Sequence, residues 1–467
     1  MNNFTPTPDY PLMNKSSLFS STNTNLPSFI LKTLLGFFLY WFLLWIFVDK
    51  SDARISLFTH TLAALFSTLV YTHLLFRNTK FTTIVCLIFA LKMGIGLWHY
   101  FTFINPDYFS TPSAILLHSE FQVYFDTISN FANDKTTHGL FYTSDNFLLV
   151  SHPELLNIIS VVFRYTGNYV LTIAPLNTLS SIYMALGITY VAKHMQMGNL
   201  TKYVLFFCLF FPISLISSFF FRDMFGMMLM TIGVVCVVLA KKSKFILLII
   251  ASLFFYLQRT PYVIIPFAAF ALSEFTFLGG NKRSINSSFV KNSIGALMIV
   301  FVVVLLPFLS SLTDANAMYL SIFSNIIAIV LFPVKFIVGL IGPFPWSQWS
   351  DSLESTYQLQ DYLLAVTLCA SFWHIVPAFI KQLKIKAGFD FITLTGLLIV
   401  IMGVMNPFMT VGYIGEGLPF LAPFLLQIVS PKAFAFTFIK VLFLFLLANM
   451  VFIAFGLRGI GLGLLFK

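Results

Sequence analysis

The chain has 467 residues, of which 58% are hydrophobic and only 9% are charged. Soluble domains carry about 25% charged residues, so these proportions exclude a soluble globular enzyme. Apolar stretches long enough to cross a bilayer recur from residue 28 onward and predict an all-α, polytopic membrane protein. The formal net charge of +10 does not indicate nucleic-acid binding, because basic residues gather in loops that the positive-inside rule keeps in the cytoplasm.

The first apolar stretches set the predicted orientation. Residues 1–27 are polar and rich in Ser, Thr, Asn and Pro, so we expect a disordered N-terminus. Residues 28–467 are expected to form a single multi-pass membrane domain. The first three spans are predicted at 28–48, 55–76 and 81–103. Arg77 and Lys80 lie between the second and third spans, which places that loop and the N-terminus in the cytoplasm.

A long polar stretch follows the third span. Residues 105–153 carry several acidic side chains and a single Lys or Arg, Lys135, so they predict the first large outer loop. Residues 154–172 are broken by Arg164 and by Gly167, and we interpret them as an interfacial helix on the same side.

Later apolar stretches predict spans that alternate between the two sides, with basic residues at their inner ends. These spans are 173–192, 203–221, 224–240, the bent pair 245–278, 292–312, 362–380, 389–404, 418–429 and 434–455. Together with the first three they give about 11–14 spans, counted by the length needed to cross a bilayer.

A second outer region interrupts this alternation. Residues 320–345 start and end on the outer side and contain several prolines. They predict re-entrant or interfacial helices, because irregular backbone at membrane depth is tolerated only inside protein or beside a cavity. With the acidic loop 346–361 they form one outer region, residues 320–361.

Ionisable residues that the positive-inside rule leaves unexplained converge on the outer face. A charge within membrane depth is by default a functional hypothesis. Arg222 and Asp223 form either a turn closed by an ion pair, with Asp223 as N-cap of a helix beginning near Met224, or part of a site. Arg259 lies in a tight bend, where it either snorkels to lipid headgroups or holds a phosphate together with Arg222.

Other outer residues are candidates with plain alternatives. Glu120 and Asp126 lie on a short amphipathic helix, as solvated acids or as a general base for a sugar hydroxyl. Trp346 is either an interface anchor or a platform for a sugar ring. Glu416, between two glycines, is either an exposed loop acid or a member of the outer set, to which Lys335 also belongs.

Cofactor and nucleotide motifs do not occur in the sequence. His118, His138 and His152 share the first outer loop, but their spacing matches no zinc motif. There is no P-loop, dinucleotide fingerprint, HExxH or nucleophile elbow. The sequence therefore predicts no cofactor; a divalent cation remains open but has no support from residue spacing. The four cysteines lie in apolar runs and are interpreted as small core residues.

Several features occur in an order typical of one kind of membrane protein. They are an acidic helix with Tyr124 after the third span, the segment Pro175 to Ser181, the Pro, Ser and Arg-Asp pattern from Pro212 to Asp223, Arg259-Thr260-Pro261-Tyr262, and Pro343-Phe344-Pro345-Trp346. Over about residues 100–420 this order resembles GT-C-like glycosyltransferases and Wzy-type O-antigen or capsule repeat-unit polymerases of bacterial surface-polysaccharide assembly. The chain departs from the pattern at Glu120, where Asp is common, and at Glu416, where a basic residue is expected.

The resemblance implies transfer of a sugar or repeat unit from an undecaprenyl-phosphate-type carrier at the periplasmic face of the bacterial inner membrane. It implies that Arg222 and Arg259 hold the carrier phosphates, and that Glu120 or Asp126 activates the acceptor hydroxyl. Asp223 would orient the first arginine or assist a cation. The implied partners are the polyprenyl-linked donor, the glycan acceptor, membrane lipid and other polysaccharide-assembly membrane proteins.

Two rival functions remain open at this point. A flippase for lipid-linked oligosaccharide needs charges at mid-span depth along a polar pathway, and the candidates are Lys92, Arg164 and Glu274. No internal repeat typical of inverted-repeat transporters is visible. A non-catalytic membrane scaffold would leave the outer set of charged residues unexplained.

Overall fold

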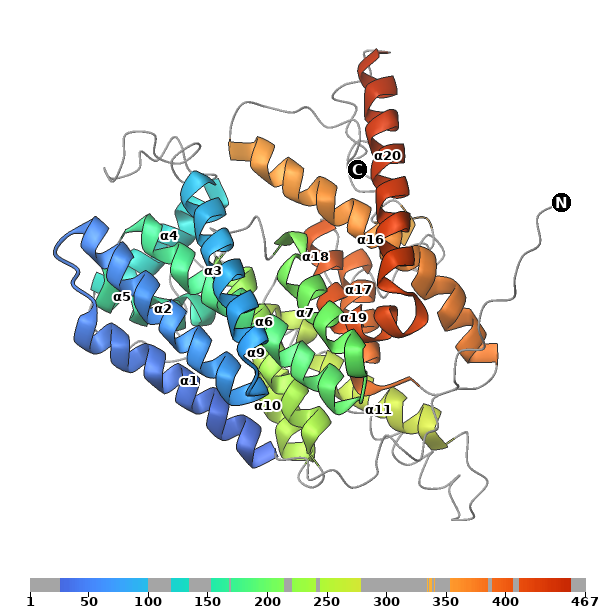
Figure 1. The fold of residues 1–467 in the computed structure, drawn as a ribbon, viewed down its shortest axis with the longest axis horizontal. Helices are drawn as coiled ribbons and strands as arrows, with labels where there is room; N and C mark the ends of the chain where they lie inside the picture. The colour runs from blue at the N-terminus through green and yellow to red at the C-terminus, as the bar shows by residue number, and fades with distance from the viewer. Residues whose placement is uncertain are drawn as a thin grey trace.

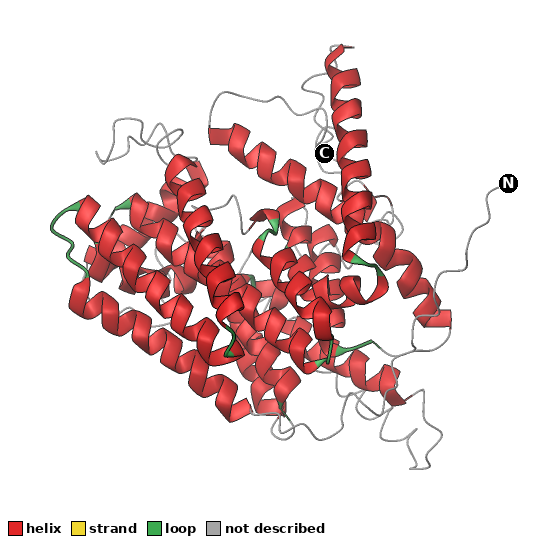
Figure 2. Ribbon diagram, viewed as in Figure 1, coloured by secondary structure: helices red, strands yellow, loops and turns green. Residues whose placement is uncertain are grey.

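The computed structural model describes residues 26–99, 119–133, 153–167, 169–213, 221–240, 244–278, 334, 336–337, 340, 353–384, 389–405 and 411–454. Within this part of the chain every regular element is a helix (Figure 2), as the composition predicts. The predicted span 292–312 and most of the outer region 320–361 lie outside the described residues, as does most of the loop 105–153.

Five described helices are long and apolar enough to cross a membrane. They are Leu26–Phe47, Ala53–Phe76, Thr79–Trp98, Asp361–Leu383 and Pro431–Ala448. Six further apolar helices have 10–17 residues within the described part of the chain. The described part therefore contains fewer full-length spans than the sequence predicts, although the membrane class itself is supported.

Four helices pack side by side in the N-terminal half (Figure 1). They are α1 (Leu26–Phe47), α2 (Ala53–Phe76), α3 (Thr79–His99) and α6 (Ile173–His194). The carboxylate of Asp52 caps α2 by accepting hydrogen bonds from the backbone N–H groups of Arg54 and Ile55. Helix α6 is buried along almost its whole length and forms the centre of this half.

Polar side chains join these helices in the interior. Among the side-chain contacts that cross between them are Tyr40 Oη with His60 Nε2 (2.7 Å), Ser67 Oγ with Tyr183 Oη (2.8 Å), and Thr33 Oγ1 with Tyr71 Oη (3.2 Å). Where Ser67 approaches the backbone of α1, Gly36 lets the helices come close, since a Cβ there would meet the Tyr183 hydroxyl. Small residues and interhelical hydrogen bonds of this kind hold helices together where lipid gives no hydrophobic driving force.

A pair of shorter helices covers one end of this half. Helix α4 (Ser119–Asn133) packs on α5 (Pro153–Thr166), and α5 also contacts α1, α2, α9 and α10. Arg164 Nη2 donates to the Phe131 carbonyl (3.2 Å), and Lys50 Nζ donates to the Arg164 carbonyl (3.3 Å). The predicted break is confirmed at Gly167, whose φ is +80°, and the 3-10 turn η2 (Val170–Thr172) leads into α6.

The predicted span 203–221 is interrupted at Phe210, and its residues 214–220 lie outside the described part of the chain. The chain forms α7 (Thr201–Leu209), a helix of nine residues that ends before Phe210. Pro212 explains the end, because it has no N–H for an intrahelical hydrogen bond. The pair α9 (Phe221–Leu239) and α10 (Lys244–Gln258) follows. The pair is antiparallel, since Gly226 lies against Gln258 and Gly233 against Ala251.

The bend predicted near residue 259 is confirmed. Helix α10 ends at Gln258, and η4 (Thr260–Ile264) and α11 (Ile265–Leu278) continue after it. Pro261 lies at the start of η4, where a missing N–H costs nothing.

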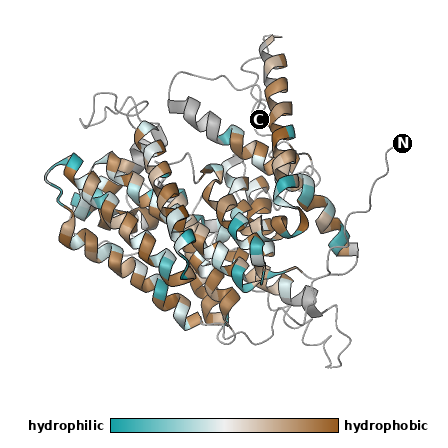
Figure 3. Ribbon diagram, viewed as in Figure 1, coloured by the Kyte–Doolittle hydropathy of each residue, from teal (hydrophilic) through white to brown (hydrophobic). Residues whose placement is uncertain are grey.

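The C-terminal half consists of α16 (Leu353–Lys384), α17 (Phe391–Met405), α18 (Val411–Gly415), α19 (Leu418–Ile428) and α20 (Pro431–Ala454). The predicted loop 346–361 is wrong at its end, because α16 already begins at Leu353. Its first turns contain Glu and Gln, which favour helix, so the helix extends beyond the apolar stretch. Helix α20 is apolar nearly throughout (Figure 3), and Phe443 is 64% exposed, as expected for a lipid-facing helix.

Charged residues divide the described helices into two ends. Phe29 of α1 stacks on Tyr190 of α6, and Tyr190 meets Phe76 of α2 edge-on, so the start of α1 and the ends of α2 and α6 meet. We call this the basic end, formed by Lys32, Arg77, Lys193 and His194. Lys244 is the first residue of α10, and Arg259 directly follows the last one. The 15 residues of α10 give a helix about 22 Å long, which separates the two side chains. Arg259 thus lies at the opposite end of the α9–α10 pair.

Candidate functional site

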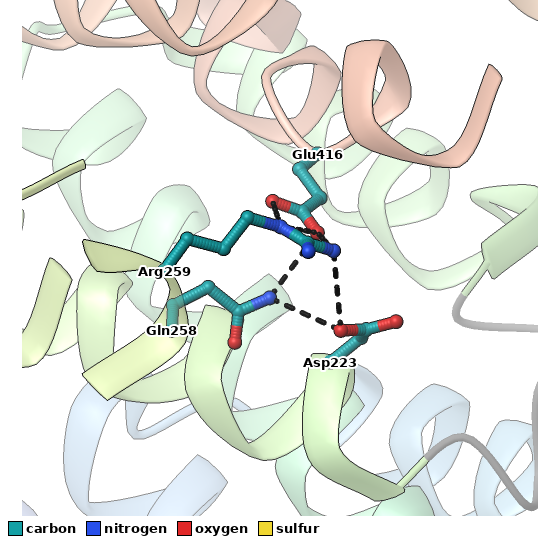
Figure 4. A network of polar contacts seen from close by, with 4 residues as sticks. All are labelled: Asp223, Gln258, Arg259 and Glu416. Atoms are coloured by element: carbon teal, nitrogen blue, oxygen red, sulfur yellow. Dashed lines mark hydrogen bonds and ion pairs between the residues drawn. The ribbon is translucent and has the colours of Figure 1, made fainter. Parts of the chain in front are cut away.

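Three segments that are far apart in the sequence bring charged side chains together. Asp223 lies in the first turn of α9, Gln258 and Arg259 follow each other where α10 ends, and Glu416 lies in the turn between α18 and α19. Figure 4 shows the four side chains pointing toward one another. We call Asp223, Gln258, Arg259 and Glu416 the four-residue cluster.

The strongest contact in the cluster joins Arg259 to Glu416. Arg259 Nη2 donates to Glu416 Oε1 at 2.8 Å, and Nε donates to Oε1 and Oε2 at 3.2 and 3.4 Å. The side chains are 11% and 2% exposed, so the pair is withdrawn from solvent. Charge-assisted contacts of this forked kind are the strong hydrogen bonds of proteins.

Asp223 and Gln258 complete the cluster. Arg259 Nη2 lies 3.5 Å from Asp223 Oδ1, and the Asp223 side chain is 27% exposed, so it forms the open edge. Gln258 is fully buried, and its Nε2 donates to Asp223 Oδ1 (3.4 Å) and to Glu416 Oε1 (3.2 Å). A single arginine and a single amide thus bridge two carboxylates that would otherwise repel each other.

Aromatic and electrostatic contacts keep Arg259 charged. The guanidinium Cζ lies 3.7 Å from the centre of the Tyr413 ring, a close cation–π contact. Burial opposes the charge, but the carboxylates of Glu416 and Asp223 outweigh it and raise the pKa of Arg259 well above its ordinary value. Arg259 is therefore a permanent cation held in place from several directions.

Glycines allow the backbone to build this cluster. A Cβ on Gly226, one turn after Asp223 in α9, would overlap the Gln258 amide. A Cβ on Gly417 would overlap the Gly396 carbonyl oxygen, so the turn that carries Glu416 packs directly on the backbone of α17. Gly417 is needed for this close approach, which explains how a turn residue such as Glu416 comes to be buried.

The structure corrects three alternatives from the sequence. Glu416 is not an exposed loop acid, because only 1% of the residue is accessible. Arg259 does not reach toward headgroups, since its guanidinium is paired inside the protein. Asp223 is not the N-cap of α9, because the helix already begins at Phe221 and places the carboxylate in the first turn. There it is still favoured by the helix dipole.

The remaining predicted site residues are not brought into the cluster by described contacts. Glu120, Tyr124 and Asp126 lie on α4, and Arg222 lies on α9, but their side chains are outside the described residues. Lys335 and Trp346 are also outside them.

Sequence reasoning missed Gln258 and Tyr413. Gln258 could have been recognised from the sequence, because it ends an apolar stretch directly before Arg259 and an amide in such a place needs a hydrogen-bond partner. Tyr413 carried no distinguishing signal among the many aromatic residues.

Metal-ligating residues do not gather elsewhere in the described part of the chain, where no three His, Cys, Asp or Glu side chains come together. The four cysteines are free thiols: Cys208 and Cys236 are buried, and Cys86 and Cys369 are half-buried. Comparisons with family models, with curated proteins and with solved structures found no match to this chain.

Proposed function

We propose that this chain is a membrane glycosyltransferase of the polysaccharide-polymerase kind, which transfers sugars or repeat units from an undecaprenyl-phosphate-type carrier at the periplasmic face. The observation that carries the proposal is the four-residue cluster. Ionisable groups inside an apolar helical protein are costly and usually functional, and here three distant segments supply them.

The position of the cluster agrees with the proposed side of the membrane. It lies at the end of the α9–α10 pair away from Lys244, and basic residues favour the cytoplasmic side. Helix α5 contacts α9, α10 and α4. Helix α4, which carries Glu120 and Asp126, is therefore linked to the α9–α10 pair through α5.

The geometry suggests a division of roles. The contacts of Arg259 use Nε and Nη2, which leaves the Nη1 donors for a phosphate oxygen of the carrier. Arg222 would supply the second guanidinium, and Asp223 at the open edge would orient it. Glu416 and Gln258 position Arg259 and do not touch substrate in this scheme.

The proposed reaction exchanges one bond at the anomeric carbon. The bond to the carrier phosphate breaks, and its electron pair leaves with the phosphate, whose charge the arginines stabilise. The acceptor hydroxyl oxygen forms the new glycosidic bond, and its proton passes to Glu120 or Asp126. Since the phosphate is already a good leaving group, the protein mainly positions the reactants and supplies one base.

A complementation experiment tests the proposal. Cells that lack the gene receive the wild type, Arg222→Ala or Arg54→Ala, and the length of their surface polysaccharide is read on a gel. Arg54 is a matched control, because it is an exposed arginine in the first turn of α2. We expect long chains with the wild type and with Arg54→Ala, and single repeat units with Arg222→Ala.

Two outcomes would contradict the proposal. If Arg222→Ala gives polysaccharide chains of normal length, at a normal protein level in the membrane, Arg222 takes no part in the reaction. If deletion of the gene prevents even single repeat units from reaching the surface, the protein acts before polymerisation, as a flippase would.

A further inference from the structure

The basic end holds like charges together without an acidic partner among the described residues. Lys32 is half-buried on α1, about one turn after Phe29, whose ring stacks on Tyr190 of α6; Tyr190 also meets Phe76, the residue before Arg77. His194, also half-buried, follows Lys193 at the end of α6. The helices α1, α2 and α6 thus each contribute a cation to the basic end.

Helix dipoles explain only part of this arrangement. Arg77 and Lys193 lie at the C-terminal ends of α2 and α6, where cations are favoured. Lys32 lies in the second turn of α1, far from the C-terminal carbonyl groups of that helix, so the dipole of α1 does not favour a cation at this position. Bringing Lys32 beside two other cations is unfavourable unless an anion joins them.

The backbone at the basic end is unusual as well. Arg77 and Gln196 are the non-glycine residues with positive φ in the described part of the chain, at 49° and 58°. They follow α2 and α6, where a helix commonly ends with glycine in this conformation. Both helices therefore end in a left-handed turn at the basic end.

Aromatic rings form the floor beneath the cations. Tyr190 stacks on Phe29 (5.3 Å between ring centres) and meets Phe76 edge-on (6.2 Å). Lys193 Nζ lies 5.6 Å from the centre of the Phe76 ring, and the His194 ring lies 4.4 Å from that of Tyr190. The three helices therefore pack against one another at this end, directly beneath the cations.

The surface next to Lys32 is apolar and open. Leu31, Leu34 and Leu35 of α1 are 58%, 59% and 45% exposed, and Phe38 continues the same surface one turn further along. A small soluble anion could not bury these apolar side chains, whereas the acyl chains of a lipid could.

We infer that the basic end binds one anionic phospholipid, with its phosphate between Lys32, Arg77 and Lys193 and its acyl chains along α1. Basic pockets between helices on the cytoplasmic side are suited to anionic headgroups. The inference is independent of the proposed glycosyltransferase function.

Lipid binding to the full-length purified protein tests the inference. The protein is reconstituted in nanodiscs of phosphatidylcholine with increasing phosphatidylglycerol, and the bound anionic lipid is counted by native mass spectrometry. We expect Lys32→Gln to weaken phosphatidylglycerol binding about fivefold, the usual contribution of one cation near an anionic surface. Lys32→Arg should keep it, and Lys440→Gln, which changes a lysine on α20, should have no effect.

Three results would overturn the inference. Equal retention of phosphatidylglycerol and zwitterionic phosphatidylcholine would show that the headgroup charge plays no role. Equal behaviour of Lys32→Gln and Lys440→Gln would remove the role of the basic end. Displacement of the lipid by millimolar inorganic phosphate would show a soluble anion site instead. If Lys32→Gln does not fold, Lys193→Gln, which changes an exposed side chain, carries the same test.

Discussion

Removing the charge of Arg259 should destabilise the protein more than removing the charge of Glu416. Arg259→Gln leaves the Glu416 carboxylate, 2% exposed, and Asp223 without a cation between them. Breaking a buried ion pair from one side costs about 3–5 kcal/mol. Glu416→Gln leaves Arg259 with Asp223 at 3.5 Å and with an amide oxygen as acceptor, so we expect about 1–3 kcal/mol.

The double variant gives the sharper test. Arg259→Gln with Glu416→Gln removes both buried charges and keeps side chains that can form hydrogen bonds. We therefore expect the second substitution to restore part of the stability that Arg259→Gln loses, with a coupling energy of about 1–3 kcal/mol. Unfolding in detergent, followed by circular dichroism, measures all three variants, and Arg54→Gln serves as the control for loss of an exposed arginine.

Additive losses would refute this reasoning. If the double variant is as unstable as the sum of the single variants, the two side chains do not interact in the folded protein. Losses below about 0.5 kcal/mol for either single variant would mean that the pair is exposed, because surface pairs contribute little.

Further substitutions test the packing around the cluster and in the N-terminal half. Gly417→Ala pushes a Cβ against backbone and should cost about 2–3 kcal/mol in thermal unfolding; Gly94→Ala, with open space around it, should be neutral or stabilise by up to about 1 kcal/mol. Gly226→Ala should displace only the Gln258 amide. The free energy of unfolding of the double variant Gly226→Ala with Gln258→Ala should therefore lie within about 0.5 kcal/mol of that of Gly226→Ala alone. Tyr40→Phe removes a hydroxyl from a buried histidine and should cost about 0.5–1.5 kcal/mol, whereas no loss would show that this contact is absent.

The helical class and most helix positions follow from the sequence, because apolar length and prolines act locally. The bend at Arg259 was predictable, since Pro261 begins a new turn directly after an apolar helix. The early end of α7 was equally available from Pro212, but the continuous hydropathy of the segment hid it. The extension of α16 beyond its apolar stretch was missed because hydropathy alone does not register polar helix formers.

The cluster itself was only half predictable. Asp223, Arg259 and Glu416 were recognised as charges that topology leaves unexplained, yet the contact between Arg259 and Glu416 joins residues 157 positions apart. Such a pairing depends on how α18 and α19 pack against α17, which no local pattern records. The glycines beside Glu416 suggested an exposed turn, whereas Gly417 in fact permits close contact between two backbones.

This pairing changes the part that Arg259 can take in phosphate binding. The resemblance to polysaccharide polymerases leads one to expect a basic residue where this chain has Glu416. In the structure Glu416 instead accepts hydrogen bonds from two nitrogens of Arg259. A phosphate at Arg259 would meet a guanidinium whose charge is already shared with Glu416 and Asp223. Attraction of the carrier would then depend mainly on Arg222, with Arg259 serving to orient the phosphate. On this reasoning, Glu416→Gln in the complementation assay should shorten the polysaccharide less than Arg222→Ala does, and equal loss in the two variants at equal protein level would contradict it.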